Sequence, residues 1–70
     1  MDARRDDAVS TLIDLIACCR DGEFAYRACA RQVHNESLRH MLLHHAAECE
    51  SAVAELRAWV LRFAGPAVVQ

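Results

Sequence analysis

Hydrophobic residues recur every three or four positions through both halves of the chain. In the first half this spacing connects eight predicted inward positions: Val9, Leu12, Ile16, Cys19, Glu23, Tyr26, Ala30 and Val33. In the second half it connects Leu38, Leu42, His45, Cys49, Ala52, Leu56, Trp59 and Phe63. A hydrophobic repeat of about 3.5 residues is typical of packed α-helices. The pattern therefore predicts two long amphipathic helices that pack along a seam.

Helix-boundary residues place these two helices in the chain. Asp2 is a suitable N-cap for the first helix and Asn35 for the second, because both side chains can accept a hydrogen bond from a free backbone N–H. Gly65 and Pro66 predict where the second helix ends, since glycine favours the position after a helix and proline cannot continue one. We predict a single helical-hairpin domain with a helix over about 3–33, a turn at 34–35, a helix over about 36–64 and a tail at 65–70.

The Asp21-Gly22 pair is the weak point of the first predicted helix. Glycine costs about 1 kcal/mol relative to alanine inside a helix, and Asp-Gly is often a turn. A break there would produce three helices. Because the heptad spacing continues through Gly22 without a slip, we favour one continuous helix in which Gly22 is a position of close backbone approach.

The apolar stripes are wider than one helix–helix contact requires. Further apolar residues flank both seams: Leu15, Cys18 and Phe24 in the first half, and Met41, Leu43, Val53 and Val60 in the second. A short turn between long helices favours an antiparallel hairpin. A chain of 70 residues is marginal alone and usually requires a disulfide, a metal or oligomerisation. The fold class that we predict is all-α: a two-helix hairpin that forms a four-helix bundle as a homodimer.

Polar side chains interrupt both seams at about the same distance from the turn. Carboxylate, imidazole and thiolate groups are the usual ligands of zinc, iron and copper. The candidate metal ligands are Glu23, His45, Cys49 and Glu48, and Tyr26 is expected beside His45. The alternative is structural, with Glu23 paired to Arg20 or Arg27 and His45 hydrogen-bonded within the core. The sequence supports both the metal-binding and the structural interpretation. A cofactor, either iron, zinc or copper, is expected only under the first.

The four cysteines show no C-x-x-C spacing, so the usual zinc-ribbon and thioredoxin signatures are missing. Buried cysteines commonly behave as small hydrophobic residues, and we expect this of Cys18, Cys19 and Cys29. Cys49 is the candidate for chemistry. A thiol-based function, such as redox sensing or copper storage, would require exposed thiols with a low pKa.

Charge and hydropathy limit the classes of partner and location. The formal net charge is -2 with histidine neutral, which predicts no attraction to nucleic acid or to anionic membranes. No stretch of about 18 apolar residues is present to span a membrane. The charged start of the chain does not read as a signal peptide, so we expect a cytoplasmic protein with reduced cysteines. We find no nucleophile–base pair and no phosphate-binding loop, so an enzyme is not expected.

Several short segments resemble a bacterial four-helix-bundle family of the ferritin-like group, known only as a domain of unknown function. The resemblance is carried by Leu12-Ile13-Asp14-Leu15-Ile16, Cys19-Arg20-Asp21-Gly22-Glu23, Tyr26-Arg27-Ala28, Leu38 with Leu42, Ala47-Glu48, Ala54-Glu55-Leu56 and Gly65-Pro66. The family's domain is typically longer, with a second helix pair. The resemblance therefore implies that a second copy supplies the missing pair, as in the short ferritin-like proteins associated with encapsulins.

The resemblance also implies that Glu23 is the first-helix carboxylate of a ferritin-like site. Such di-iron sites use a Glu-x-x-His motif in the second helix, and this motif occurs nowhere in the chain. We therefore expect no ferroxidase activity. The function that we predict is structural or partner-binding, with an unidentified protein partner, and mixed Glu/His/Cys metal binding is the alternative.

Overall fold

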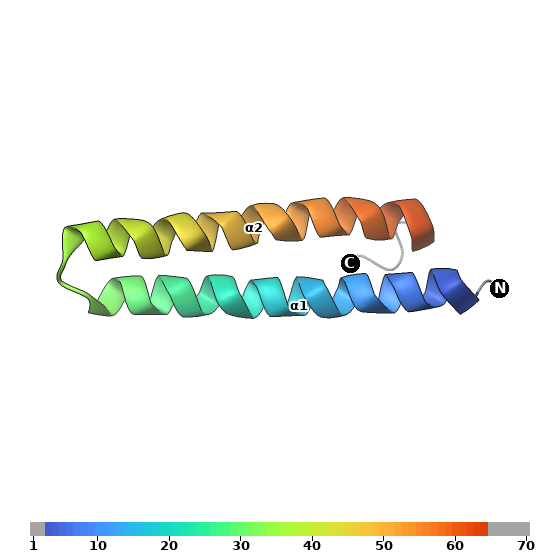
Figure 1. The fold of residues 1–70 in the computed structure, drawn as a ribbon, viewed down its shortest axis with the longest axis horizontal. Helices are drawn as coiled ribbons and strands as arrows, with labels where there is room; N and C mark the ends of the chain where they lie inside the picture. The colour runs from blue at the N-terminus through green and yellow to red at the C-terminus, as the bar shows by residue number, and fades with distance from the viewer. Residues whose placement is uncertain (1–2, 65–70) are drawn as a thin grey trace.

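The computed structural model describes residues 3–64, and these residues form two helices. Helix α1 spans Ala3–Gln32 and helix α2 spans Glu36–Ala64. They run antiparallel and side by side along a molecule that measures 52 × 17 × 14 Å (Figure 1). The predicted all-α hairpin is thus confirmed. Helix α1 ends at Gln32, one residue before the predicted end at Val33. The predicted boundary residues Asp2, Gly65 and Pro66 lie outside the described residues.

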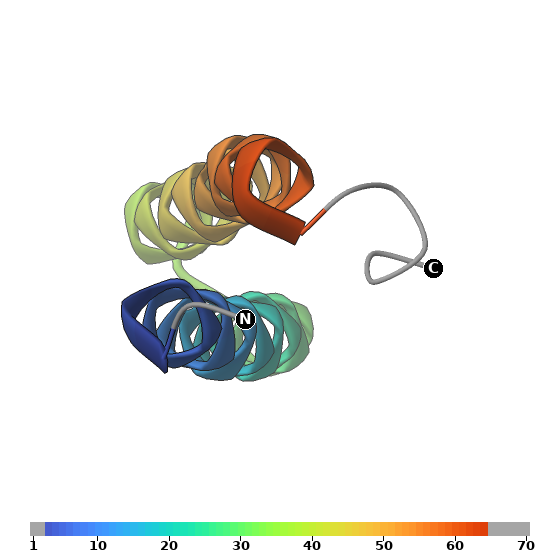
Figure 2. The same ribbon diagram turned by 90° about the vertical axis from the view of Figure 1, so that its right-hand side faces the viewer.

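The two helices form a single layer. Viewed along their length, α1 and α2 lie one above the other (Figure 2). Within residues 3–64 no further element covers either broad side of this layer. Each helix therefore packs against one neighbour only, and most of its circumference faces solvent.

Asn35 begins helix α2 in the predicted way. Its side-chain Oδ1 accepts a hydrogen bond of 2.9 Å from the backbone N–H of Leu38. Its backbone carbonyl accepts a hydrogen bond of 2.9 Å from the N–H of Arg39. The side-chain bond satisfies one of the four N–H groups that the first turn of a helix leaves free. The N-cap predicted at Asn35 is therefore confirmed.

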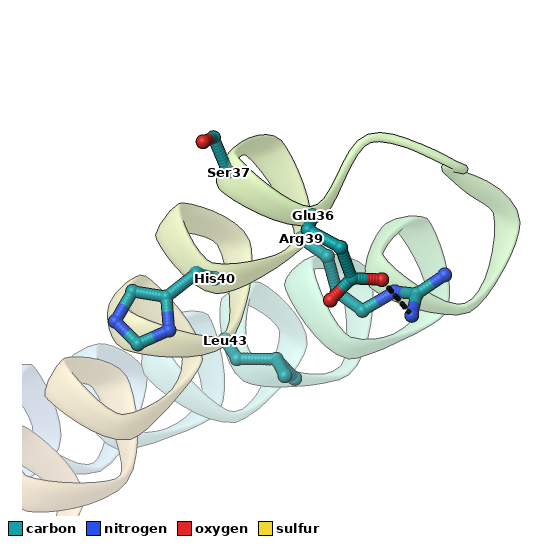
Figure 3. A pocket seen from close by; sticks show the side chains of 5 residues that line it. All are labelled: Glu36, Ser37, Arg39, His40 and Leu43. Atoms are coloured by element: carbon teal, nitrogen blue, oxygen red, sulfur yellow. Dashed lines mark hydrogen bonds and ion pairs between the residues drawn. The ribbon is translucent and has the colours of Figure 1, made fainter.

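Arg39 connects the start of α2 to the end of α1. Its guanidinium donates to the backbone carbonyl of Val33 at 2.8 Å and to that of Ala30 at 3.3 Å. It also donates to the exposed Glu36 carboxylate at 2.9 Å, the pair drawn in Figure 3. The last carbonyls of a helix have no partner within that helix. One side chain of α2 thus caps α1, and this fixes the direction in which the chain reverses.

The described core is small and differs from the predicted seam in α2. Four residues are buried: Ala30, Ala46, Val53 and Val60. The predicted inward residues Trp59 and Phe63 are exposed instead, at 48% and 37%, as is Leu38. Helix α2 is rotated so that the row Ala46, Val53 and Val60 faces α1. Alanine and valine are short, so this row lets the two backbones approach more closely than a row containing tryptophan would.

Helix α1 runs through Gly22 without a break. A Cβ atom built on Gly22 would lie 3.3 Å from the Sγ atom of Cys49 in α2. This distance is shorter than ordinary van der Waals contact, so glycine leaves room for the neighbouring thiol. The predicted role of Gly22 as a position of close approach is confirmed.

Candidate functional site

The first cluster of candidate residues joins Tyr26, His45 and Glu48. The rings of Tyr26 and His45 lie with centroids 5.3 Å apart and are tilted by 33°. His45 Nδ1 lies 2.8 Å from Glu48 Oε1, a hydrogen-bond distance. His44 Nε2 lies 3.7 Å from the same carboxylate oxygen. The predicted neighbourhood of Tyr26 and His45 is confirmed, and Glu48 orients the imidazole from one turn away on the same helix.

The second cluster pairs Glu23 with arginine. Arg27 Nε donates to Glu23 Oε2 at 2.9 Å, and the other end of the guanidinium donates to Glu50 Oε2 at 3.0 Å. The hydrogen bond to Glu23 raises the pKa of Arg27 above its usual value, and the charges of Glu23 and Glu50 act in the same direction. The sequence left open whether Glu23 is a metal ligand or pairs with an arginine. In the structure Glu23 forms the ion pair with Arg27. Arg27 also ties α1 to α2.

The cysteines divide into two groups. Cys19 and Cys49 are half-buried, and Cys49 of α2 lies against Gly22 of α1. Cys18 and Cys29 are exposed. The expectation that Cys18 and Cys29 pack as small hydrophobic residues is therefore wrong for the single chain. The reason is the number of neighbours: a residue on the side of α1 has no element to pack against in a two-helix layer.

The four predicted metal ligands do not converge in one chain. His45 and Glu48 are brought together, whereas Glu23 forms an ion pair with Arg27 and the Cys49 thiol packs against Gly22. No group of three or more His, Cys, Asp and Glu side chains within residues 3–64 is arranged to hold a metal ion. Metal binding by these residues stays a prediction, and it would require ligands from more than one chain or a rearrangement of Glu23.

Two features were missed by sequence reasoning. One is the capping of α1 by Arg39. The only sequence signal for it is an arginine four residues after the N-cap Asn35, and this signal is weak. The other is an aromatic cluster at the open end of the hairpin. There Trp59 and Phe63 stack with centroids 6.1 Å apart, and the Arg62 guanidinium lies 4.8 Å from the Trp59 ring centroid. An aromatic pair at i and i+4 on a helix could have indicated this stack.

No helix in the described part of the chain is both long and apolar enough to cross a membrane.

Comparison of the sequence with known proteins identifies its family but assigns no chemical role to its residues. No curated protein and no solved structure matches the sequence. One protein family does match, over residues 7–68, which include nearly all of both helices. The chain belongs to this family, described as a domain of unknown function (DUF2383).

Proposed function

We propose that the protein is a non-enzymatic, ferritin-like helical bundle that two copies of the chain complete, and that it acts structurally or by binding another protein. One observation carries this proposal. Nine large hydrophobic side chains are exposed in the described hairpin, against four small buried ones. Exposed apolar residues in this proportion indicate a surface that is covered in the working state.

The energetics of the hairpin support the same proposal. The largest fully buried side chain is that of Val60, and burial of one valine contributes only about 1.5–3 kcal/mol. Ordering each residue opposes folding by about 1–2 kcal/mol. A two-helix layer with so small a core requires more buried surface to fold, and a second hairpin is the simplest source. The chain thereby gains the four-helix arrangement that its resemblance to ferritin-like proteins implies.

The absence of enzymatic activity and the cytoplasmic location belong to the same proposal and rest on the sequence. No complete set of nucleophile, base and oxyanion donors was recognised in it. The candidate acids and bases that the structure describes are engaged as an ion pair between Glu23 and Arg27 and as a hydrogen bond between His45 and Glu48.

Native mass spectrometry of protein purified without a metal-affinity tag tests the proposal directly. The expected result is a homodimer that is the main species at micromolar concentration. A folded protein that stays monomeric at all concentrations, with helical circular dichroism, would contradict it. The measurement also records any bound metal, and so it addresses the second candidate function in the same experiment.

The second candidate function is transition-metal binding by the bundle, and the His45–Glu48 pair favours it. A carboxylate that holds one ring nitrogen of histidine fixes the ring and leaves the other nitrogen for a metal. His45 would then be the central ligand, with Glu23, Glu48 and Cys49 as further candidates. We expect zinc, iron or copper to be lost in His45→Ala and kept in His40→Ala, in which an exposed histidine is removed. Equal metal content in both variants would argue against this function.

A further inference from the structure

The hairpin has two broad sides of different chemistry, and contacts between the two helices distinguish them. Successive residues of a helix are separated by about 100° around its axis. Tyr26 and Arg27 therefore point to opposite sides of the line along which α1 meets α2. Tyr26 contacts His45, and Arg27 contacts Glu50. These two contacts mark the two sides of the layer.

On the side marked by Tyr26 and His45, the side chains along the middle are uncharged, and charge lies toward the edges, where Glu48 is hydrogen-bonded to His45 and Arg62 covers Trp59. We call this side the uncharged face, made of Thr11, Leu15, Cys18, Gly22, Cys29, Leu38, Met41, His45, Ala52, Trp59 and Phe63. At the open end of the hairpin it forms a mostly apolar groove, whose lining residues are Asp7, Ala8, Thr11 and Leu12 of α1 and Leu56, Trp59 and Phe63 of α2.

The side marked by Arg27 and Glu50 carries charge along its whole length. We call it the charged face, made of Ile13, Arg20, Phe24, Arg27, Arg31, Leu43, Glu50, Arg57 and Leu61. A shallow pocket there is lined by three arginines together with Glu23 and Phe24. Covering this face with another apolar surface would remove these charges from water, which is unfavourable unless each charge gains a partner.

We infer that the second copy of the chain binds the uncharged face, through the same face of its own, and leaves the charged face exposed. This inference rests on the proposed function and adds to it the surface that the dimer uses. A self-complementary contact is what a two-fold homodimer requires. A face that is uncharged along its middle can meet its own copy there without repulsion, whereas the charged face would oppose its arginine side chains to those of the partner.

The size of the face agrees with a stable dimer. The layer measures 52 Å by 17 Å, so its broad side covers about 900 Å², against about 800 Å² per partner in a standard interface. A second copy is the fitting occupant because the hairpin alone has too small a core. Whatever covers this face must be present whenever the chain folds, and only another copy always is.

Three residue pairs give matched variants for a test. In each pair two large hydrophobic residues lie two positions apart, so that about 200° separates them around the helix. Their exposed fractions are nearly equal: Leu15 45% with Ile13 41%, Met41 45% with Leu43 41%, and Trp59 48% with Leu61 45%. The first residue of each pair lies on the uncharged face and the second on the charged face.

The experiment replaces each of these six residues singly by glutamate and measures the dimer dissociation constant by sedimentation equilibrium. We expect Leu15→Glu, Met41→Glu and Trp59→Glu to raise that constant by about a hundredfold, because each dimer would bury two unpaired carboxylates. The paired variants Ile13→Glu, Leu43→Glu and Leu61→Glu should change it by about threefold or less. The opposite order, with dissociation in the charged-face variants, would overturn the inference while leaving the dimer itself intact.

Thiol labelling of the unaltered protein provides a second readout that does not depend on how the variants fold. Cys18 and Cys29 are exposed in the single chain, lie eleven residues apart, and therefore share the uncharged face. If this face is the interface, both thiols should be alkylated slowly in the dimer and faster as dilution produces monomer. Fast labelling of both in a dimer that stays intact would show that another surface joins the copies. An unaltered protein that is monomeric would instead contradict the proposed function.

Discussion

The Arg39 side chain makes three hydrogen bonds around the turn between the helices. Replacing it by methionine keeps most of the aliphatic chain and removes every hydrogen-bond donor. In the structure those donors reach the carbonyl of Ala30 in the last turn of α1, the carbonyl of Val33 just after it, and the carboxylate of Glu36. The variant leaves both carbonyls to water or without a partner. We therefore expect Arg39→Met to lower the free energy of unfolding.

The magnitude follows from the three contacts of Arg39. A hydrogen bond that involves a charged group contributes about 1.5–3 kcal/mol when it is well shielded, and the Arg39 side chain is 38% exposed. The 2.8 Å bond to Val33 should therefore contribute about 1–1.5 kcal/mol, and the longer 3.3 Å bond to Ala30 about 0.5 kcal/mol. The ion pair with Glu36, whose side chain is 84% exposed, should add at most about 0.5 kcal/mol. The expected loss is about 2 kcal/mol.

Urea unfolding followed by far-ultraviolet circular dichroism measures this loss. All variants must be compared at one protein concentration, because dimer formation makes the apparent stability depend on concentration. Glu36→Gln is the matched control, since it removes the ion pair and keeps both carbonyl contacts, and it should lose no more than about 0.5 kcal/mol. Equal losses in Arg39→Met and Glu36→Gln would refute the reasoning, because the carbonyl contacts would then contribute nothing.

Three further variants test other parts of the hairpin by the same urea assay. Asn35→Ala should lose about 1 kcal/mol because the Oδ1 cap of α2 disappears, and an unchanged midpoint would contradict the cap. Gly22→Ala should have little net effect, since crowding against Cys49 offsets the gain of about 1 kcal/mol in helix propensity. In a Cys49→Ala background, Gly22→Ala should raise the free energy of unfolding by about 1 kcal/mol. Equal effects of Gly22→Ala in both backgrounds would exclude the close contact with Cys49. Val60→Ala should cost about 2 kcal/mol through the cavity it leaves, whereas the exposed neighbour tested by Leu61→Ala should change stability by about 0.5 kcal/mol or less.

The parts of the fold that local chemistry determines were predictable from the sequence. The two helices, the turn, the cap at Asn35 and the close approach at Gly22 each depend on residues near one another in the chain or on an unbroken repeat. The height of Tyr26 opposite His45 was also predictable, because in an antiparallel hairpin residues at equal distance from the turn face each other. The capping of α1 by Arg39 was not, since it depends on which rotamer a long side chain adopts across the turn.

The predicted metal cluster shows what a helical repeat leaves undetermined. The repeat places Glu23, His45, Glu48 and Cys49 at similar heights, but it does not decide to which side of the contact each side chain turns. Glu23 turns toward Arg27, which shares a face with Glu50, whereas His45 lies on the side of Tyr26. A rotation of one helix by a fraction of a turn is enough to separate such a set.

The same rotation explains the error in the seam of α2. Its apolar positions form three adjacent rows at seven-residue spacing. One row faces α1 and contains Ala46, Val53 and Val60. A second row contains Leu42, Cys49 and Leu56 and is half-buried. It lies between the row that faces α1 and the row on the uncharged face. The third row, Leu38, His45, Ala52 and Trp59, lies on the uncharged face. Sequence periodicity identified the second and third rows as inward. If the second copy covers the uncharged face, as we propose, those two rows point to the centre of a four-helix bundle, and the repeat in the sequence describes the core of the dimer better than the contact within one hairpin.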